Sequence, residues 1–213
     1  MVALRICFVG DSITNGTGDN EYLGWPGRLC AAERARGHDI SHYNLGIRGD
    51  TSEMIEARWR DECAARLPDM HQGALVFSFG INDTAREADG RLRVEPGSSI
   101  ASARRILAEA KAWKPTLMIG PTPILRESLT LSLNPGLPRE VQDARIAAAS
   151  SALAALCAEL GVPYLDLFAP LSADPRFAKS IAEGDGIHPT APGYAVMADL
   201  IGRWPAWRKW FGG

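Results

Sequence analysis

Residues able to carry out nucleophilic catalysis follow the apolar runs of this sequence. Ser12 ends a Gly-Asp-Ser tripeptide directly after the run Leu4–Val9. A serine hydroxyl is a weak nucleophile at neutral pH and needs a base within hydrogen-bonding distance. His188 is the candidate base, because its imidazole can take the hydroxyl proton and later return it. Asp185, three residues earlier, could hold the ring tautomer and stabilise the imidazolium. Together these residues predict a Ser-His-Asp site.

Two other segments offer donors for a negatively charged oxygen. Asn82 follows the run Ala74–Gly80 and has a side-chain N–H, and Gly49 follows the run His42–Gly46 and has a sterically open backbone N–H. With the N–H of Ser12 they could form a three-donor oxyanion hole, in which each donor is worth about 3 kcal/mol.

The Asp-x-x-His spacing is not evidence of a site on its own, because Asp39 and His42 repeat it. That copy enters a predicted strand, where residues three apart point to opposite faces. Asp185 and His188 lie instead in a loop bounded by Gly and Pro, just before a predicted helix. Position in the chain therefore favours the second copy.

The candidate residues need elements that bring them together, and short β runs alternate here with helical stretches. The predicted strands are Leu4–Val9, His42–Gly46, Ala74–Gly80, Thr116–Gly120 and Val162–Leu167. The predicted helices are Trp25–Gly37, Thr51–Leu67, Gly97–Lys114, Arg139–Leu160 and Pro192–Arg203. This alternation predicts a parallel sheet covered on both faces, with the continuously apolar third strand at its centre and the fifth at an edge because of Pro163. The carboxyl ends of such strands share one edge, so the polar segments should converge there.

Composition narrows the class of protein. The chain has 213 residues, 46% of them hydrophobic, and a formal net charge of -2. These values predict a single domain over residues 1–213 and argue against a nucleic-acid partner. The sequence contains no apolar run long enough for a membrane span and no secretory leader pattern, so we expect a cytoplasmic protein.

The cysteine and histidine spacings predict neither disulfides nor a metal site. Four cysteines are scattered through apolar or helical contexts without a Cys-x-x-Cys pair: Cys7, Cys30, Cys63 and Cys157. Buried free thiols explain them best. The four histidines form no metal-ligand pattern, and no phosphate-cradling glycine motif is present, so no cofactor is predicted.

Three segments carry no assigned function. Thr84–Pro96 and Pro121–Pro138 both follow strand ends, where they could wall a substrate site or simply be surface loops. The apolar leucines of the second also suit a subunit contact, which leaves a homo-oligomer open. The aromatic and basic tail Trp204–Phe211 favours packing on the body or on a neighbouring subunit over a membrane interface.

Four segments resemble the sequence blocks of the SGNH/GDSL hydrolase superfamily, in family order: Gly10-Asp11-Ser12-Ile13, Gly49-Asp50-Thr51, Gly80-Ile81-Asn82-Asp83 and Asp185-Gly186-Ile187-His188. The resemblance spans nearly the whole chain and implies a flavodoxin-like three-layer α/β/α fold. It implies Ser12 as nucleophile, Asp185 and His188 as its partners, and Gly49 and Asn82 as oxyanion donors. Ile13 replaces the leucine of the family name, which is a packing change, and Gly46 competes with Gly49 in the second block.

The function that follows is a serine esterase acting on a small-molecule ester, with short-chain or acetyl esters as the expected substrates. Acyl-CoA thioesterase or lysophospholipase activity and carbohydrate deacetylation are alternatives that the same architecture accommodates. From a different class, a flavodoxin-like module could bind a ligand at the strand ends. That alternative leaves the Ser-His-Asp set without a role.

Overall fold

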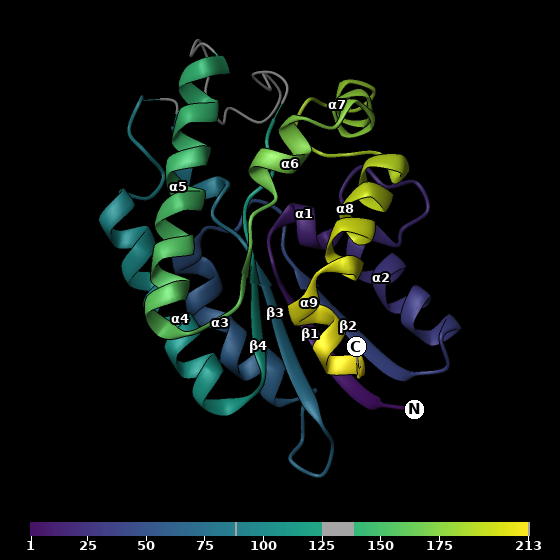
Figure 1. Ribbon diagram of the computed structural model, residues 1–213. Coiled ribbons are helices and arrows are strands. Elements are labelled where there is room, and N and C mark those ends of the chain that lie inside the picture. Colours follow the sequence, from purple (N-terminus) through teal and green to yellow (C-terminus); the bar gives the residue numbers. More distant parts are fainter. Residues whose placement is uncertain (88, 125–138, 213) are drawn as a thin grey trace.

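The predicted parallel sheet is present, with five strands in the order β2-β1-β3-β4-β5 among the residues that the computed structural model describes, 1–87, 89–124 and 139–212 (Figure 1). The strands are β1 (Ala3–Gly10), β2 (Asp39–Gly46), β3 (Gly73–Ser78), β4 (Thr116–Ile119) and β5 (Tyr164–Leu165). Gly10 is in register with Gly46 on one side and with Ser78 on the other. Three strands therefore end side by side, at the edge where the polar segments begin.

The apolarity of each strand matches its place in the sheet. All six residues of β3 are buried, and β3 lies at the centre as predicted. β2 is an edge strand with a largely polar sequence, and it begins at Asp39, three residues before the predicted start. β5 lies at the opposite edge and covers only two residues of the predicted Val162–Leu167. Pro163 precedes it and has no N–H to donate to β4, so regular pairing begins only at Tyr164.

Helices cover both faces of the sheet and form the predicted three layers (Figure 1). The helices α3 (Ser52–Ala64), α4 (Pro96–Trp113) and α5 (Arg139–Leu160) lie on one face. The helices α2 (Gly24–Ala35), α8 (Ala191–Arg203) and α9 (Pro205–Arg208) lie on the other. Successive side chains of β1 point to opposite faces of the sheet. Ile6 and Phe8 pack in the core under α2 and α8, and Cys7 and Val9 pack in the core under α3 and α4.

Several short elements were not predicted. They are α1 (Ser12–Asn15), α6 (Phe168–Ser172), α7 (Pro175–Ala182), α9 and the 3₁₀ turns η1 (Asn82–Thr84) and η2 (Lys209–Phe211). The start of α7 carries a recognisable signal, because the Asp174 side chain accepts the Arg176 N–H at 2.8 Å and Pro175 opens the helix. The signal was available in the sequence as an Asp-Pro pair.

The aromatic tail packs on the body of the molecule, as favoured above. The Trp207 side chain is fully buried, and its indole N–H donates to Glu33 of α2 at 3.0 Å. Arg208 pairs with the same carboxylate. Among the described residues, no helix has both the length and the apolarity to cross a bilayer.

Thr84–Pro96 contains a bridge that pairs Arg86 with Leu92 in antiparallel orientation. In Pro121–Pro138, residues 125–138 lie outside the described part of the chain. All four cysteines are buried free thiols.

Candidate active site

Three side chains from the two ends of the chain form one hydrogen-bonded row. Ser12 Oγ lies 2.8 Å from His188 Nε2, and His188 Nδ1 lies 2.6 Å from Asp185 Oδ2. An ionised carboxylate can only accept, so Asp185 requires the ring proton on Nδ1. In the neutral ring Nε2 is then the acceptor for the Ser12 hydroxyl. This is the arrangement that a serine nucleophile and its general base require.

The loop before α8 holds Asp185 in its charged form. Partial burial works to raise the pKa of this carboxyl, but hydrogen bonds from the His188 backbone N–H, the His188 ring and the Ile187 N–H hold its pKa below the ordinary value. Oδ1 accepts those two backbone N–H groups at 2.8 and 2.9 Å. Asp185 is therefore anionic at neutral pH and stabilises a positive charge on the ring.

Apolar packing fixes the same loop to the body. Ile187 lies in a small core with Ile81, Ile124 and Ile146. A Cβ at Gly18 would lie 2.9 Å from the Pro189 carbonyl oxygen and 3.3 Å from His188 Cβ, so the glycine lets these two backbone segments come close.

Ser12 opens α1 at the end of β1, and its neighbours explain the residue types around it. A Cβ at Gly10 would lie 2.1 Å from the Ser78 carbonyl oxygen and 2.2 Å from Thr14 Oγ1, so only glycine fits there. Asp11 precedes the helix as its N-cap and accepts the Ile13 N–H at 2.9 Å. The hydroxyl of Ser12 is left to face His188.

Asp11 lies next to Ser12 in the chain, and its hydrogen bond to the start of α1 is structural. Burial raises its pKa to about 7 against the lowering effect of the Ile13 N–H, and the nearby charges of Asp83 and Asp50 add to the increase. The carboxyl is inside the molecule, with two other acidic side chains close enough to disfavour its ionised form.

Replacing Asp11 by asparagine is expected to remove a pH-dependent loss of stability. Asparagine keeps the acceptor for Ile13 but cannot ionise. An acid whose folded pKa is raised stabilises the fold below its unfolded pKa, and that stability is lost as the pH rises through the folded value. Here the window runs from the ordinary value of 3.8 to about 7. Relative to Asp11→Asn, the wild-type free energy of unfolding should fall by about 4 kcal/mol across that window.

Urea unfolding at a series of pH values measures this difference. Parallel stability curves for the two proteins would contradict a raised pKa at Asp11.

Gly49 and Gly46 have different surroundings, which bear on the choice between them. A Cβ at Gly46 would lie 2.2 Å from the Asn15 backbone N, and its own N–H donates to Asn44 Oδ1 at 3.0 Å. Gly46 thus lets β2 pack against α1, the helix that begins at Ser12. Gly49 has a φ of 82° with open space where a Cβ would lie. In the described part of the chain no hydrogen bond uses its N–H, which therefore suits an incoming oxyanion better.

Asn82 lies beside the second block. Its Nδ2 donates one hydrogen bond to the Asp50 carbonyl at 2.9 Å and has a second N–H. Asp83 Oδ1 accepts the N–H of Ser52, the first residue of α3, at 2.8 Å. The structure therefore brings Asn82 next to the Gly49-Asp50 segment, while Ser12, His188 and Asp185 form the separate row described above.

The second Asp-x-x-His pair has no part in this arrangement. Both residues lie in β2, and Asp39 pairs with Arg34 at 3.5 Å. Burial lowers the pKa of His42. Among the residues described, no three His, Cys, Asp or Glu side chains gather in a metal-binding cluster.

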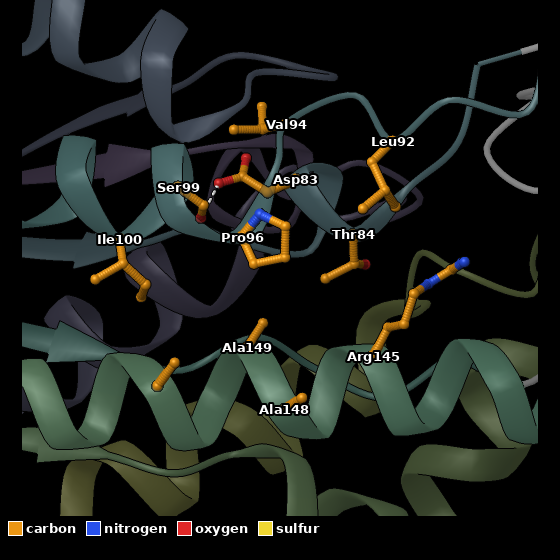
Figure 2. Close-up of a pocket in the computed structure, with 11 residues that line it drawn as sticks. Asp83, Thr84, Leu92, Val94, Pro96, Ser99, Ile100, Arg145, Ala148 and Ala149 are labelled. Carbon is orange, nitrogen blue, oxygen red and sulfur yellow. Dashed lines mark hydrogen bonds between the residues drawn. The ribbon is translucent and has the colours of Figure 1, made fainter.

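An apolar cavity of about 340 Å³ lies between α5 and the segment after Asn82 (Figure 2). Figure 2 shows Leu92, Val94 and Pro96 on one side and the alanines of α5 on the other. Asp83 and Thr84 also line it, whereas Ser12, His188 and Asp185 do not. The residues that line the cavity thus start at Asp83, one residue after Asn82, and continue in the segment Thr84–Pro96.

Two arginines near the site were not singled out in the sequence. Arg58 of α3 donates to Asp50 Oδ2 at 2.7 Å and to the Gly10 carbonyl at 3.0 Å. Arg93 donates to the Gly49 carbonyl at 3.0 Å. No local signal marks them, because each looks like an ordinary surface charge until the chain is folded.

Comparison with known proteins gives one family match. The sequence matches the family model for the GDSL-like lipase/acylhydrolase family over residues 8–196. A search of curated proteins found no match.

Solved structures with the same architecture include a lipase/acylhydrolase from Enterococcus faecalis, with a TM-score of 0.74, 23% identity, and coverage of 98% of this chain and 97% of that chain. The acetylxylan esterase Axe2 from Geobacillus stearothermophilus has a TM-score of 0.71 and 20% identity, covering 95% of each chain. The acetyl xylan esterase AlAXEase has a TM-score of 0.69 and 20% identity, covering 92% of this chain and 97% of that chain. At these identities the likeness establishes a shared fold.

Proposed function

Because the chain belongs to the GDSL-like lipase/acylhydrolase family, and so is a hydrolase acting on esters, we propose that it is a serine esterase that forms an acyl-enzyme on Ser12. The observation that carries this proposal is the hydrogen-bonded row of 2.8 Å and 2.6 Å from Ser12 through His188 to Asp185. A hydroxyl, an imidazole and a carboxylate in this order form the unit that nucleophilic acyl transfer by a serine requires.

In the first half of the reaction, Ser12 Oγ attacks the ester carbonyl carbon while its proton moves to His188 Nε2. The carbonyl oxygen becomes an anion, which the N–H groups of Ser12 and Gly49 and the Asn82 amide stabilise. The bond to the alcohol oxygen then breaks, and His188 returns the proton to the leaving alcohol. The charge of Asp185 stabilises the imidazolium throughout.

In the second half, water attacks the acyl carbon and gives its proton to His188 Nε2. The same donors stabilise the second oxyanion. Collapse of this intermediate breaks the bond to Ser12 Oγ, which takes the proton back from His188 and releases the carboxylic acid. No group beyond this chain and water is needed to balance either half.

We propose acetyl or other short-chain esters of small molecules as the substrates, with residues 1–213 acting as one catalytic domain. The fold shared with two acetyl xylan esterases supports this choice. The cavity beside Asn82 favours a second candidate, an ester or thioester with a longer acyl chain. Its lining from α5 and the segment Thr84–Pro96 is mainly apolar, with Thr84 and Arg145 as the polar members.

One assay tests the Ser12 nucleophile, and a second separates the two candidate substrates. A fluorophosphonate probe should label the wild-type protein and fail to label Ser12→Ala, because only an activated serine reacts. A series of p-nitrophenyl esters from acetyl to palmitoyl, assayed beside an acetylated xylo-oligosaccharide and palmitoyl-CoA, then reads out the acyl preference. Maximal kcat/KM at acetyl is the expected result, and a maximum at long chains would replace the short-chain proposal by the second candidate.

A further inference from the structure

The short segment that carries the Gly49 donor is held from outside at three points. Arg93 Nη2 donates to the Gly49 carbonyl at 3.0 Å, and Asn82 Nδ2 donates to the Asp50 carbonyl at 2.9 Å. Arg58 Nε donates to the Asp50 carboxylate at 2.7 Å. The carbonyls of Gly49 and Asp50 and the Asp50 side chain thus each accept a hydrogen bond from a different part of the chain.

Few backbone hydrogen bonds hold the segment itself. The Ile47 N–H donates to the Gly10 carbonyl at 3.0 Å, and the turn is closed by a hydrogen bond of 3.3 Å from the Asp50 N–H to the Ile47 carbonyl. Gly49 has a φ of 82° and no neighbour within 4 Å of the position of a Cβ. Glycine reaches many backbone conformations at similar energy, so an unrestrained Gly49 would sample orientations in which its N–H points away from a reacting carbonyl.

Arg58 extends the restraint to the nucleophile. Its guanidinium also donates to the carbonyls of Gly10 and Leu45, both at 3.0 Å. Gly10 comes two residues before Ser12, and Leu45 is the next-to-last residue of β2, the strand that leads to the Gly49 turn. One planar group therefore binds the backbone before the nucleophile and the acid after the oxyanion donor, which sets their separation.

Arg93 belongs to the segment Thr84–Pro96, and two contacts within that segment hold it in place. Its backbone N–H donates to the Ala85 carbonyl at 2.9 Å, and its Nε lies 3.3 Å from Glu87 Oε1. The side chain is 17% exposed and reaches 44 residues back along the sequence. Arg91, two residues earlier, points to solvent and pairs only with Asp89 of its own turn among the described contacts.

We propose that Arg58 and Arg93 are positioning residues that hold the Gly49 N–H in the orientation needed to bind the oxyanion. Arg93 is the one of the two that lies in the segment Thr84–Pro96. The proposal rests on the esterase function proposed above. Neither arginine touches the reacting atoms, because both act on the carbonyl and carboxylate groups of the Gly49-Asp50 segment and its neighbours.

Steady-state kinetics of Arg93→Ala on p-nitrophenyl acetate tests the proposal. We expect kcat to fall about 10- to 100-fold, with KM changed less than about threefold, because a displaced donor weakens transition-state binding more than substrate binding. Arg93→Lys should recover most of the loss, since an ammonium can still donate to the Gly49 carbonyl. Arg91→Ala is the matched control from the same segment and should keep wild-type kcat and KM.

The pH profile of kcat/KM separates positioning from a charge effect. Loss of a hydrogen bond to Gly49 should lower the plateau and leave the midpoint of the profile unchanged. A shifted midpoint with a wild-type plateau would mean that the Arg93 charge acts on the titrating base, and would overturn the proposal. Wild-type kcat in Arg93→Ala would overturn it as well.

Arg58→Lys supplies the second arm. A lysine cannot bind the Gly10, Leu45 and Asp50 acceptors together, so kcat should fall while thermal unfolding stays cooperative. Because removal of Arg58 could unfold the chain, the Arg93 variants carry the decision. Failure of the esterase function itself is distinguishable, since the wild-type protein would then neither hydrolyse the ester nor react with a fluorophosphonate.

Discussion

Ser12→Ala is expected to lose ester hydrolysis by about 10⁴-fold or more while folding normally. The covalent route depends on the Oγ that attacks the carbonyl, and alanine has no atom to replace it. The rest of the constellation remains, so the rate that persists should be the small contribution of the oxyanion donors. Initial rates on p-nitrophenyl acetate, with active-site titration of the wild type, measure the difference.

The structural cost of the same change should be small. The Ser12 side chain has one described hydrogen bond, to His188 Nε2, and its loss is worth about 1 kcal/mol. Thermal unfolding should therefore stay close to that of the wild type. Ser41→Ala is the matched control, because Ser41 is an exposed serine on β2, and it should keep full activity. If Ser12→Ala turned over the ester at the wild-type rate, the nucleophile would lie elsewhere.

Asp185→Asn is expected to lower kcat by about 10³- to 10⁴-fold. The amide keeps an oxygen for the backbone N–H groups of Ile187 and His188, so the loop retains its hydrogen bonds. It can, however, turn an N–H toward His188 Nδ1. The ring would then carry its proton on Nε2, where it cannot accept the Ser12 hydroxyl.

Asp39→Asn provides the control for this variant, since Asp39 belongs to the second Asp-x-x-His pair and lies exposed at the start of β2. We expect it to keep wild-type kcat. The lowered pKa of Asp185 also sets the direction of the pH effect, because the carboxylate stabilises the site above its ordinary pKa and this effect is lost as the pH falls through the lowered value. If Asp185→Asn kept an activity within about tenfold of wild type, Asp185 would not be part of the catalytic machinery, and only Ser12 and His188 would remain in it.

The strands and long helices were predictable because their signals are local. Continuous apolarity predicted β3 at the centre of the sheet, and all its residues are buried. Glycine ends β1 and β2, because it acts on its own φ. β3 instead ends at Ser78, two residues before Gly80, and α3 ends at Ala64, four residues before Pro68. The short helices α6 and α9 were not predicted, because one or two turns contain too few residues to show a hydrophobic periodicity.

The candidate triad was also predictable from the sequence, but through the topology of the sheet rather than through a local signal. Each member follows a strand or precedes a helix, and parallel strands must bring their carboxyl ends to one edge. Topology therefore implied that Ser12 and His188 could meet, although 176 residues separate them. The choice between the two Asp-x-x-His pairs depended on the same reasoning, because a strand spreads the pair that a loop brings together.

The residue types and the order of the elements were thus enough to predict the sheet, the candidate nucleophile and its partners. The support around them required the folded chain. Arg58 and Arg93 are ordinary charges in the sequence, and their acceptors are backbone carbonyls of Gly10 and Gly49, which lie 48 and 44 residues away. A carbonyl is the same group at every residue, so nothing in the sequence marks the one that an arginine will reach. Only the packing of β1, β2, α3 and the segment Thr84–Pro96 brings those particular carbonyls within the reach of the two guanidinium groups.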